Sequence, residues 1–201
     1  MARALNGLSP SFTTHDETGS TNDDARELAR DGAPHLTTVV ADRQTAGRGR
    51  RGRTWIAQPG EALLASWVVR PAIPVEQWSV LPLIVGVACV EAVRARTKVD
   101  CMLKWPNDLM VGERKLGGIL VEAEPPRFAV AGVGLNATAT DFPDDLRTPP
   151  TSLAVEGAMR LDRADLLAAI LRAFADRLGD PVDALARYRD CLLYTSPSPR
   201  D

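Results

Sequence analysis

Residues 36–70 read LTTVVADRQTAGRGRRGRTWIAQPGEALLASWVVR and contain the two strands around which the fold is predicted. The two ends of this stretch, residues 36–44 and 62–70, are rich in β-branched and aromatic residues, which favour β-strands. Between these ends, residues 42–55 hold five arginines and three glycines. The pattern predicts two strands that are joined by a long basic loop.

Helices are predicted on either side of this pair. Residues 21–30 follow hydroxyl and amide residues, carry acidic residues in their first turn, and precede Gly32 and Pro34, which are start and stop signals of a helix. Residues 79–97 are apolar almost all round, as is typical of a helix buried against a sheet. Asp162 precedes a segment with apolar residues at helical spacing that Gly179 and Pro181 end, which predicts a third helix.

The other apolar segments indicate strands. Residues 101–108 end in a turn marked by Pro106, and residues 108–124 indicate a hairpin with its turn near Gly112. Residues 127–138 are nearly all apolar until Asn136, which predicts a buried strand. This order of elements predicts an α+β fold in which helices pack on a β-sheet.

The composition fits one soluble globular domain with a sizeable core. Of 201 residues, 45% are hydrophobic and 25% are charged, and the net charge of −2 gives no reason to expect nucleic acid. The three cysteines form no CxxC pair, so neither a disulfide framework nor a zinc site is expected. The longest apolar run, residues 81–90, is about half of a membrane span, and no signal peptide is apparent. The expected location is therefore the cytosol, without a membrane partner.

The basic loop combines two residue types that suit an anion. Glycine lets backbone N–H groups converge on an anion, and arginine binds carboxylate or phosphate bidentately. Composition alone favours a mobile surface loop, and an RNA-binding segment is a further alternative, although no aromatic residues are interleaved with the arginines. A Walker A loop is excluded, because the required lysine followed by Ser or Thr is absent.

Four further motifs place polar residues at the ends of predicted elements. They are GSTN (19–22), KWPND (104–108), RKLGGILVE (114–122) and GVGLN (132–136). Each has a purely structural interpretation, as a helix cap, a turn, a solvated lysine and a strand end respectively. Each also places a polar group where a ligand could reach it, so no motif decides the function alone.

Together, these motifs and the basic loop closely resemble those of biotin protein ligases. GSTN, QTAGRGRRGR followed by Trp55, LKWPND, KLGGILVE and GVGLN occur in this order and at these separations in that family, and the resemblance spans about residues 19–153. It implies the family's catalytic fold, a mixed β-sheet with helices packed on it, of the class II synthetase-like biotin and lipoate ligase type.

The resemblance also implies roles for individual residues. Lys115, Arg48 and Arg50 would be catalytic, because they would offset the repulsion between two reacting anions. The biotin site would consist of Ser20, Thr21, Asn22, Gln44, Arg48, Gly49, Arg50 and Lys115. The nucleotide site would consist of Trp55, Lys104, Asn107 and Asn136. No residue is assigned as a metal ligand, because Mg²⁺ would be held mainly by the phosphates of ATP.

The implied reaction is that of a biotin–biotin carboxyl carrier protein ligase. ATP and Mg²⁺ would activate biotin to biotinyl-5′-AMP, and biotin would then pass to a lysine of the carrier domain of an acetyl-CoA carboxylase. The resemblance allows a homodimer and gives no reason to expect specific DNA binding. Alternatives are a lipoate or octanoate ligase or transferase of the same superfamily, and a non-catalytic module that binds biotin or nucleic acid.

The predicted domain covers residues 1–190, with a core over about residues 12–180. Some relatives carry an N-terminal helix-turn-helix domain, for which the residues before GSTN are too few, and relatives end in a small β-barrel that is not expected here. The last residues, CLLYTSPSPRD (191–201), match a translated sequencing-library adapter. They are therefore expected to be a non-native tail, in which Cys191 has no role in the fold.

Overall fold

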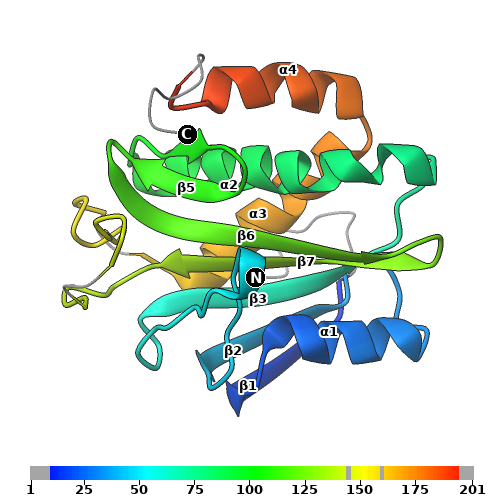
Figure 1. Ribbon diagram of the computed structural model, residues 1–201, viewed down its shortest axis with the longest axis horizontal. Helices are drawn as coiled ribbons and strands as arrows, with labels where there is room; N and C mark the ends of the chain where they lie inside the picture. Colours follow the sequence, from blue (N-terminus) through cyan, green and yellow to red (C-terminus); the bar gives the residue numbers. More distant parts are fainter. Residues whose placement is uncertain (1–9, 144–145, 159–160, 195–201) are drawn as a thin grey trace.

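The computed structural model describes residues 10–143, 146–158 and 161–194 and contains one seven-stranded sheet (Figure 1). The strand order is β1-β2-β3-β7-β6-β5-β4, and only β1 and β2 pair in parallel among these neighbours. The strands are β1 (Phe12–Thr18), β2 (Thr38–Gln44), β3 (Ala62–Val69), β4 (Met102–Lys104), β5 (Asp108–Val111), β6 (Arg114–Glu124) and β7 (Phe128–Asn136). The predicted α+β fold with a mixed sheet is confirmed.

The three predicted helices are present at their expected places. The α-helices are α1 (Thr21–Arg30), α2 (Leu81–Thr97), α3 (Arg163–Leu178) and α4 (Pro181–Cys191), and two 3₁₀ turns are η2 (Arg50–Gly52) and η3 (Val75–Val80). The Asp162 carboxylate accepts the backbone N–H groups of Ala164 and Asp165, as its predicted capping role requires. Ser20 occupies the N-cap position of α1, but its side chain makes no capping hydrogen bond.

One strand, β1, and one α-helix, α4, were not predicted. Strand β1 lies at the edge of the sheet with many exposed residues, so it lacks the apolar alternation of a half-buried strand. Pro181 looked like a helix stop after α3, yet it stands at the first position of α4, where proline is favoured. The Asp180 side chain caps α4 by accepting a hydrogen bond from the N–H of Asp183.

The sheet is covered on both faces, and β3 shows why the sequence requires this. All eight residues of β3 are buried, as expected for a strand between two layers. Leu63 and Trp67 belong to the larger core with α2, α3 and α4, whereas Val68 packs with Ala25 and Ala29 of α1 on the other face. Figure 1 shows β6 and β7 crossing the molecule, with α2 and α4 above them and α1 below.

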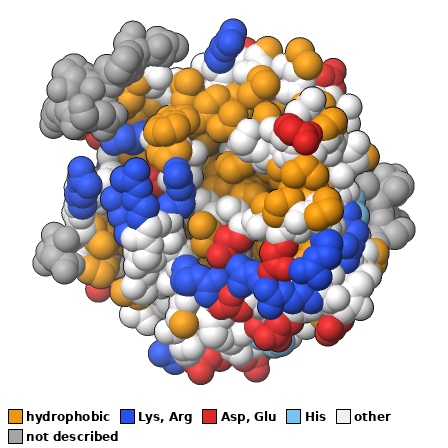
Figure 2. Space-filling view, turned by 45° about the vertical axis from the view of Figure 1, so that its right-hand side comes forward, with side chains coloured by type: hydrophobic (Ala, Val, Ile, Leu, Met, Phe, Trp, Pro, Cys, Tyr) orange, Lys and Arg blue, Asp and Glu red, His pale blue; other side chains and the backbone are white. Residues whose placement is uncertain are grey.

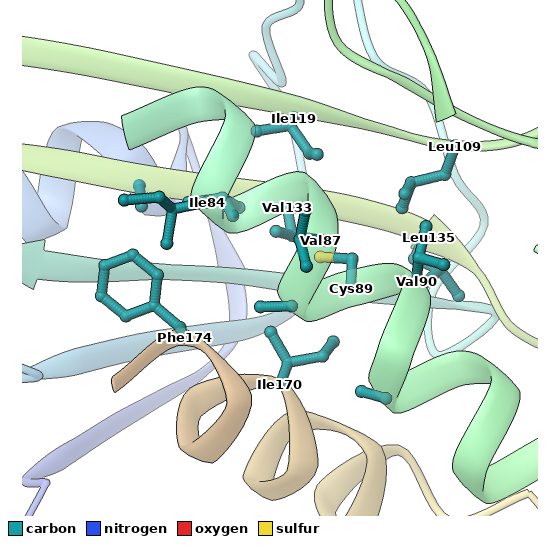
Figure 3. Packing of buried hydrophobic residues seen from close by; sticks show 14 of the residues in the cluster. Ile84, Val87, Cys89, Val90, Leu109, Ile119, Val133, Leu135, Ile170 and Phe174 are labelled. Carbon is teal, nitrogen blue, oxygen red and sulfur yellow. The ribbon is translucent and has the colours of Figure 1, made fainter. Parts of the chain in front are cut away.

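Helix α2 is the centre of the larger core. Its Ile84, Val87 and Val90 point among side chains of α3 and of strands β5, β6 and β7 (Figure 3). Among the described residues, one helical segment, Val75–Thr97, is long and apolar enough to cross a membrane. Its apolar 18-residue window has a mean hydropathy of 1.6, and 61% of that window is buried inside the fold. Its apolar character is accounted for by its position between the sheet and the outer helices.

The three cysteines are free and buried. Burial raises the pKa of the Cys101 thiol to about 12, so that this group stays protonated. The expectation that Cys191 has no role in the fold is wrong, because it ends α4 and is 5% exposed within the larger core. Tyr194 is half-exposed, and residues 195–201 lie outside the described residues. The domain limits and the non-native origin of residues 191–201 stay predictions.

Candidate active site

A cavity of about 110 Å³ lies between the start of α1, the basic loop, and strands β3, β6 and β7. Its lining includes all eight residues predicted to bind biotin, namely Ser20, Thr21, Asn22, Gln44, Arg48, Gly49, Arg50 and Lys115. Trp55 and Asn107 from the predicted nucleotide set line it as well. Motifs separated by nearly a hundred residues therefore meet at one cavity, although their individual roles stay predictions.

The inner end of this cavity is a buried polar network. The Gln44 Oε1 accepts the backbone N–H of Thr21 at 2.8 Å, and the Thr21 and Ser66 hydroxyls lie 2.7 Å apart. The Ser66 hydroxyl donates to Asn22 Oδ1 at 2.6 Å. Because Ser66 donates its proton to Asn22, the single proton of the Thr21 hydroxyl has two acceptors within reach, Ser66 Oγ and Gln44 Oε1 at 3.0 Å. Ser66 is fully buried and was not among the predicted residues.

Two glycines of β7 form the floor on which these side chains lie. A Cβ at Gly132 would overlap Asn22 Oδ1, and one at Gly134 would stand 2.6 Å from Cε2 of Trp55. The strand therefore needs glycine at both positions, because the side chains approach its backbone closely. The indole Nε1 of Trp55 is buried without a hydrogen-bond partner among the described residues, which leaves a donor for a ligand.

Lys115 stands beside Trp55 at the mouth of the cavity. Its Nζ lies 2.7 Å from Asp108 Oδ1 and 5.9 Å from the centroid of the Trp55 ring. Its backbone is held separately, since its N–H donates to Pro149 O at 2.7 Å. The ammonium group is thus placed by two side chains that themselves line the cavity.

The basic loop divides its arginines between two environments. Arg48 pairs in β-bridge fashion with Thr54, and its guanidinium binds both oxygens of Asp23 on α1. This hydrogen bonding holds the pKa of the Asp23 carboxyl below its usual range and raises that of Arg48. Arg48, predicted to act as a cation toward the ligand, is therefore already neutralised by a carboxylate.

Arg50, Arg51 and Arg53 line a second cavity of about 440 Å³, whereas Arg43 is bound by Glu17 of β1. Its cations are Arg50, Arg51, Arg53, Lys104 and Arg147, and Asp108 is the carboxylate among its described lining residues. Figure 2 shows one face of the molecule, where Lys and Arg side chains gather beside a hollow floored by hydrophobic side chains. A cavity with this charge suits a polyanion such as a triphosphate.

A third cavity, of about 270 Å³, is mainly apolar. Trp55, Phe142 and Leu146 line it together with Asn136, whose Nδ2 donates to Thr151 O at 2.9 Å. The predicted nucleotide residues are thus divided, with Lys104 and Asn107 at the cationic cavity and Trp55 and Asn136 at the apolar one. All three cavities share Arg53, so they adjoin one another.

A comparison with models of protein families shows the family to which this chain belongs. Residues 16–136 match the model of the biotin/lipoate A/B protein ligase family, which is more than half of the chain. The chain belongs to this family. All four nucleotide-set residues and the eight biotin-set residues lie within the matched segment.

Individual members of the biotin/lipoate ligase family agree with this placement. The chain is 38% identical over 172 residues to the bifunctional ligase/repressor BirA of Bacillus subtilis, covering 83% of this chain and 53% of that protein. It is also 38% identical to the biotin–acetyl-CoA-carboxylase ligase of Mycobacterium tuberculosis, covering 81% and 62%. The chain thus spans about half the length of the curated relatives it matches.

Solved structures of the family share the fold. A biotin protein ligase from Aquifex aeolicus in complex with biotin and ATP has a TM-score of 0.80 at 29% identity, covering 92% of this chain and 79% of that one. The ligase from Leishmania major in complex with biotinyl-5-AMP has a TM-score of 0.80 at 27% identity, with coverages of 96% and 88%.

Several residues in or beside the first cavity were not assigned from the sequence. Asp108 had been noted only as an exposed polar residue of the KWPND turn, Ser66 and Gly132 had been given no site role, and neither had Glu122, which binds Asn22. The signals were present but weak, because a serine within an apolar strand and alternating glycines in β7 are common in sheets. The place of Ser66 and Gly132 in the site becomes apparent only from the pairing of β3 with β7, which sets these two residues opposite each other.

Proposed function

We propose that this chain is the catalytic domain of a biotin–carrier-protein ligase. In the proposed reaction, the biotin carboxylate attacks the α-phosphorus of ATP, biotinyl-5′-AMP forms, and pyrophosphate leaves. A carrier lysine then attacks the activated carbonyl and AMP leaves. The observation that carries the proposal is the position of Lys115. This residue lines both the first cavity, which contains the buried polar network, and the third, apolar cavity.

The three cavities match three chemical groups of the two substrates, which are the ureido group of biotin, the adenine ring of ATP and the phosphates of ATP. The buried donors and acceptors around Thr21, Asn22 and Gln44 suit the ureido group of biotin, which both donates and accepts hydrogen bonds. The aromatic and apolar cavity beside Trp55 suits an adenine ring. The cationic cavity suits the phosphates.

The charges support the adenylation step in particular. Two anions must approach each other, so fixed cations placed before reaction lower the barrier as charge develops. Lys115 and Arg50 both line the first cavity and supply such cations. Solvent must also be excluded from the mixed anhydride, for which closure of the basic loop over the cavity would serve.

Mg²⁺ fits this site as a companion of ATP. Among the described residues, no group of three or more His, Cys, Asp or Glu side chains could hold a metal ion alone. Asp108 faces the cationic cavity, and one carboxylate together with substrate phosphates is a common way of holding Mg²⁺. The ion would neutralise phosphate charge there.

The partners follow from the proposed reaction. The acceptor is a lysine of a biotin carboxyl carrier domain, the reaction takes place in the cytosol, and no DNA or membrane partner is proposed. Both a monomer and a homodimer are compatible with the proposal, and sedimentation of the purified chain distinguishes them.

The test uses the purified chain with Mg-ATP and either biotin or lipoate. Pyrophosphate and biotinyl-5′-AMP, detected by mass spectrometry, are expected with biotin and not with lipoate. Adenylation of lipoate instead would assign the chain to the other branch of the family. If a folded sample adenylates neither biotin nor lipoate, the enzymatic proposal is refuted.

A further inference from the structure

One carboxylate oxygen, Oε2 of Glu122 on β6, contacts three side chains, two from α1 and one from the basic loop. Asn22 Nδ2 donates to it at 2.6 Å from the polar end of the first cavity. Arg48 of the basic loop donates to it at 3.4 Å, and Arg26 of α1 lies 2.7 Å from it. Glu122 thus joins the cavity, the loop and α1, while being absent from the cavity lining itself.

Glu122, at 2.6 Å, and the backbone carbonyl of Leu120, at 3.4 Å, both accept from Asn22 Nδ2 and set which end of the Asn22 amide faces the cavity, with Glu122 making the shorter bond. An ionised carboxylate only accepts hydrogen bonds, so the NH₂ group of Asn22 must point toward Glu122. The carbonyl oxygen then points toward Ser66 and lies over Gly132. One lone pair of this oxygen accepts from Ser66, and the second is left for a donor in the cavity.

Glu122 also helps to fix the base of the basic loop. Arg48 and Thr54 pair at the two ends of the loop, and Arg48 is bound by Asp23 and Glu122. A change at the Glu122 oxygen therefore changes one of the two anchors of the loop. Hydrogen bonds in such a chain polarise one another, so a ligand N–H on Asn22 would strengthen the contact of Asn22 with Glu122.

We propose that Glu122 is a positioning residue that couples occupancy of the Asn22 end of the cavity to the position of the Arg48 loop. The inference rests on the proposed function, because biotin is taken as the donor that reaches Asn22. Binding of biotin alone, without ATP, should then hold the loop more firmly through Glu122.

Two variants on the same surface separate this role from general loss of charge. Glu122→Gln keeps the shape and removes the charge that Arg26 and Arg48 share, and it lets the Asn22 amide turn over. Glu124→Gln is the matched control, since Glu124 binds Arg26, Arg30 and Arg127 and has no bond to Asn22 or Arg48 within the described residues. Glu122→Asp, which withdraws the carboxylate by one methylene, is the second test variant.

Limited trypsin digestion reads out the loop, because its own arginines are the cleavage sites. Saturating biotin is expected to slow cleavage within residues 48–53 by roughly tenfold in the parent and in Glu124→Gln, as protection follows the population of the open form. In Glu122→Gln and Glu122→Asp, biotin should bind about tenfold more weakly, for one charge-assisted hydrogen bond lost. Saturation should then slow cleavage less than about twofold.

The outcomes are separable. Parental affinity and parental protection in both Glu122 variants would overturn this inference and leave the proposed function standing. A parent that binds biotin without any change in loop cleavage would overturn it as well. A folded parent that fails to bind biotin by calorimetry would instead refute the proposed function, on which the inference rests.

Discussion

Replacing Gly132 by alanine should damage the first cavity. The added Cβ would overlap Asn22 Oδ1, lie 2.9 Å from its Cγ, and lie 3.2 Å from Ser66 Oγ. These atoms are backed by buried groups, since Asn22 is 5% exposed and Ser66 is fully buried. The Asn22 amide must therefore rotate away from β7.

The magnitude follows from the bonds that this rotation breaks. Asn22 would lose its bonds with Ser66 and with Glu122, both of 2.6 Å. A buried polar group that loses its partner costs about 1–3 kcal/mol, so we expect a destabilisation of about 2–5 kcal/mol. For a domain of this size, that corresponds to a fall in Tm of about 5–15 °C. Biotin affinity should fall at least about tenfold, because a loss of 1.4 kcal/mol suffices for this factor.

Thermal unfolding and calorimetric titration with biotin measure the two effects. Gly19→Ala is the matched control, because a Cβ there meets nothing within 4 Å, and it should change neither quantity. Gly132→Ala combined with Asn22→Ala should be about as stable as Asn22→Ala alone, since the two contacts shorter than 3.0 Å are both with the removed amide. A Gly132→Ala protein that unfolds at the parental temperature and binds biotin normally would refute the close approach of Asn22 to β7.

Three further predictions concern other parts of the molecule. Lys115→Ala should slow adenylate formation by about 10²–10³-fold with little change in Tm. The control Arg114→Ala, which breaks only an exposed pair with Glu156, should keep the parental rate. Equal rates for the parent and both variants would contradict a catalytic role of Lys115. Arg50→Gly should release biotinyl-5′-AMP faster, so that lysines of a bystander protein become biotinylated, and a parental level of such labelling would argue against Arg50 as a retaining group. Burial lowers the pKa of His35, so the unfolded chain takes up a proton before the folded chain does as the pH falls below about 6.5. The Tm difference between the parent and His35→Asn should therefore be largest above that pH and shrink below it. A Tm difference that does not change with pH would refute this prediction.

Local signals explain which elements could be predicted. Helices α1 and α3 carry their own start and stop residues, and the hairpin turns at Gly112, whose φ of 54° favours glycine. Strand β1 carries no such signal, because an edge strand gains its order from its partner β2. Helix α4 was missed because one residue, Pro181, fits a stop and a start equally well.

The site was predictable to the extent that motifs carry it, and no further. Thr21, Gln44 and Lys115 stand in recognisable motifs and line the same cavity. Ser66 and Glu122 act through partners at a distance in the chain, Asn22 being 44 residues from the first and 100 from the second. Their meaning depends on strand register, which places Ser66 opposite Gly132, and register is a property of the whole sheet.

The basic loop shows how pairing alters what a run of like charges means. From composition, all of its arginines are equivalent cations held on a flexible backbone. In the fold, Arg48 is bound by Asp23 and Glu122, whereas Arg50 and Arg53 line the cavities where phosphate would lie. An anchored arginine at the base limits the space that the rest of the loop explores, which lowers the entropy lost when the loop closes on an anion. The division between anchoring and binding arginines therefore follows from where the carboxylates of α1 and β6 stand.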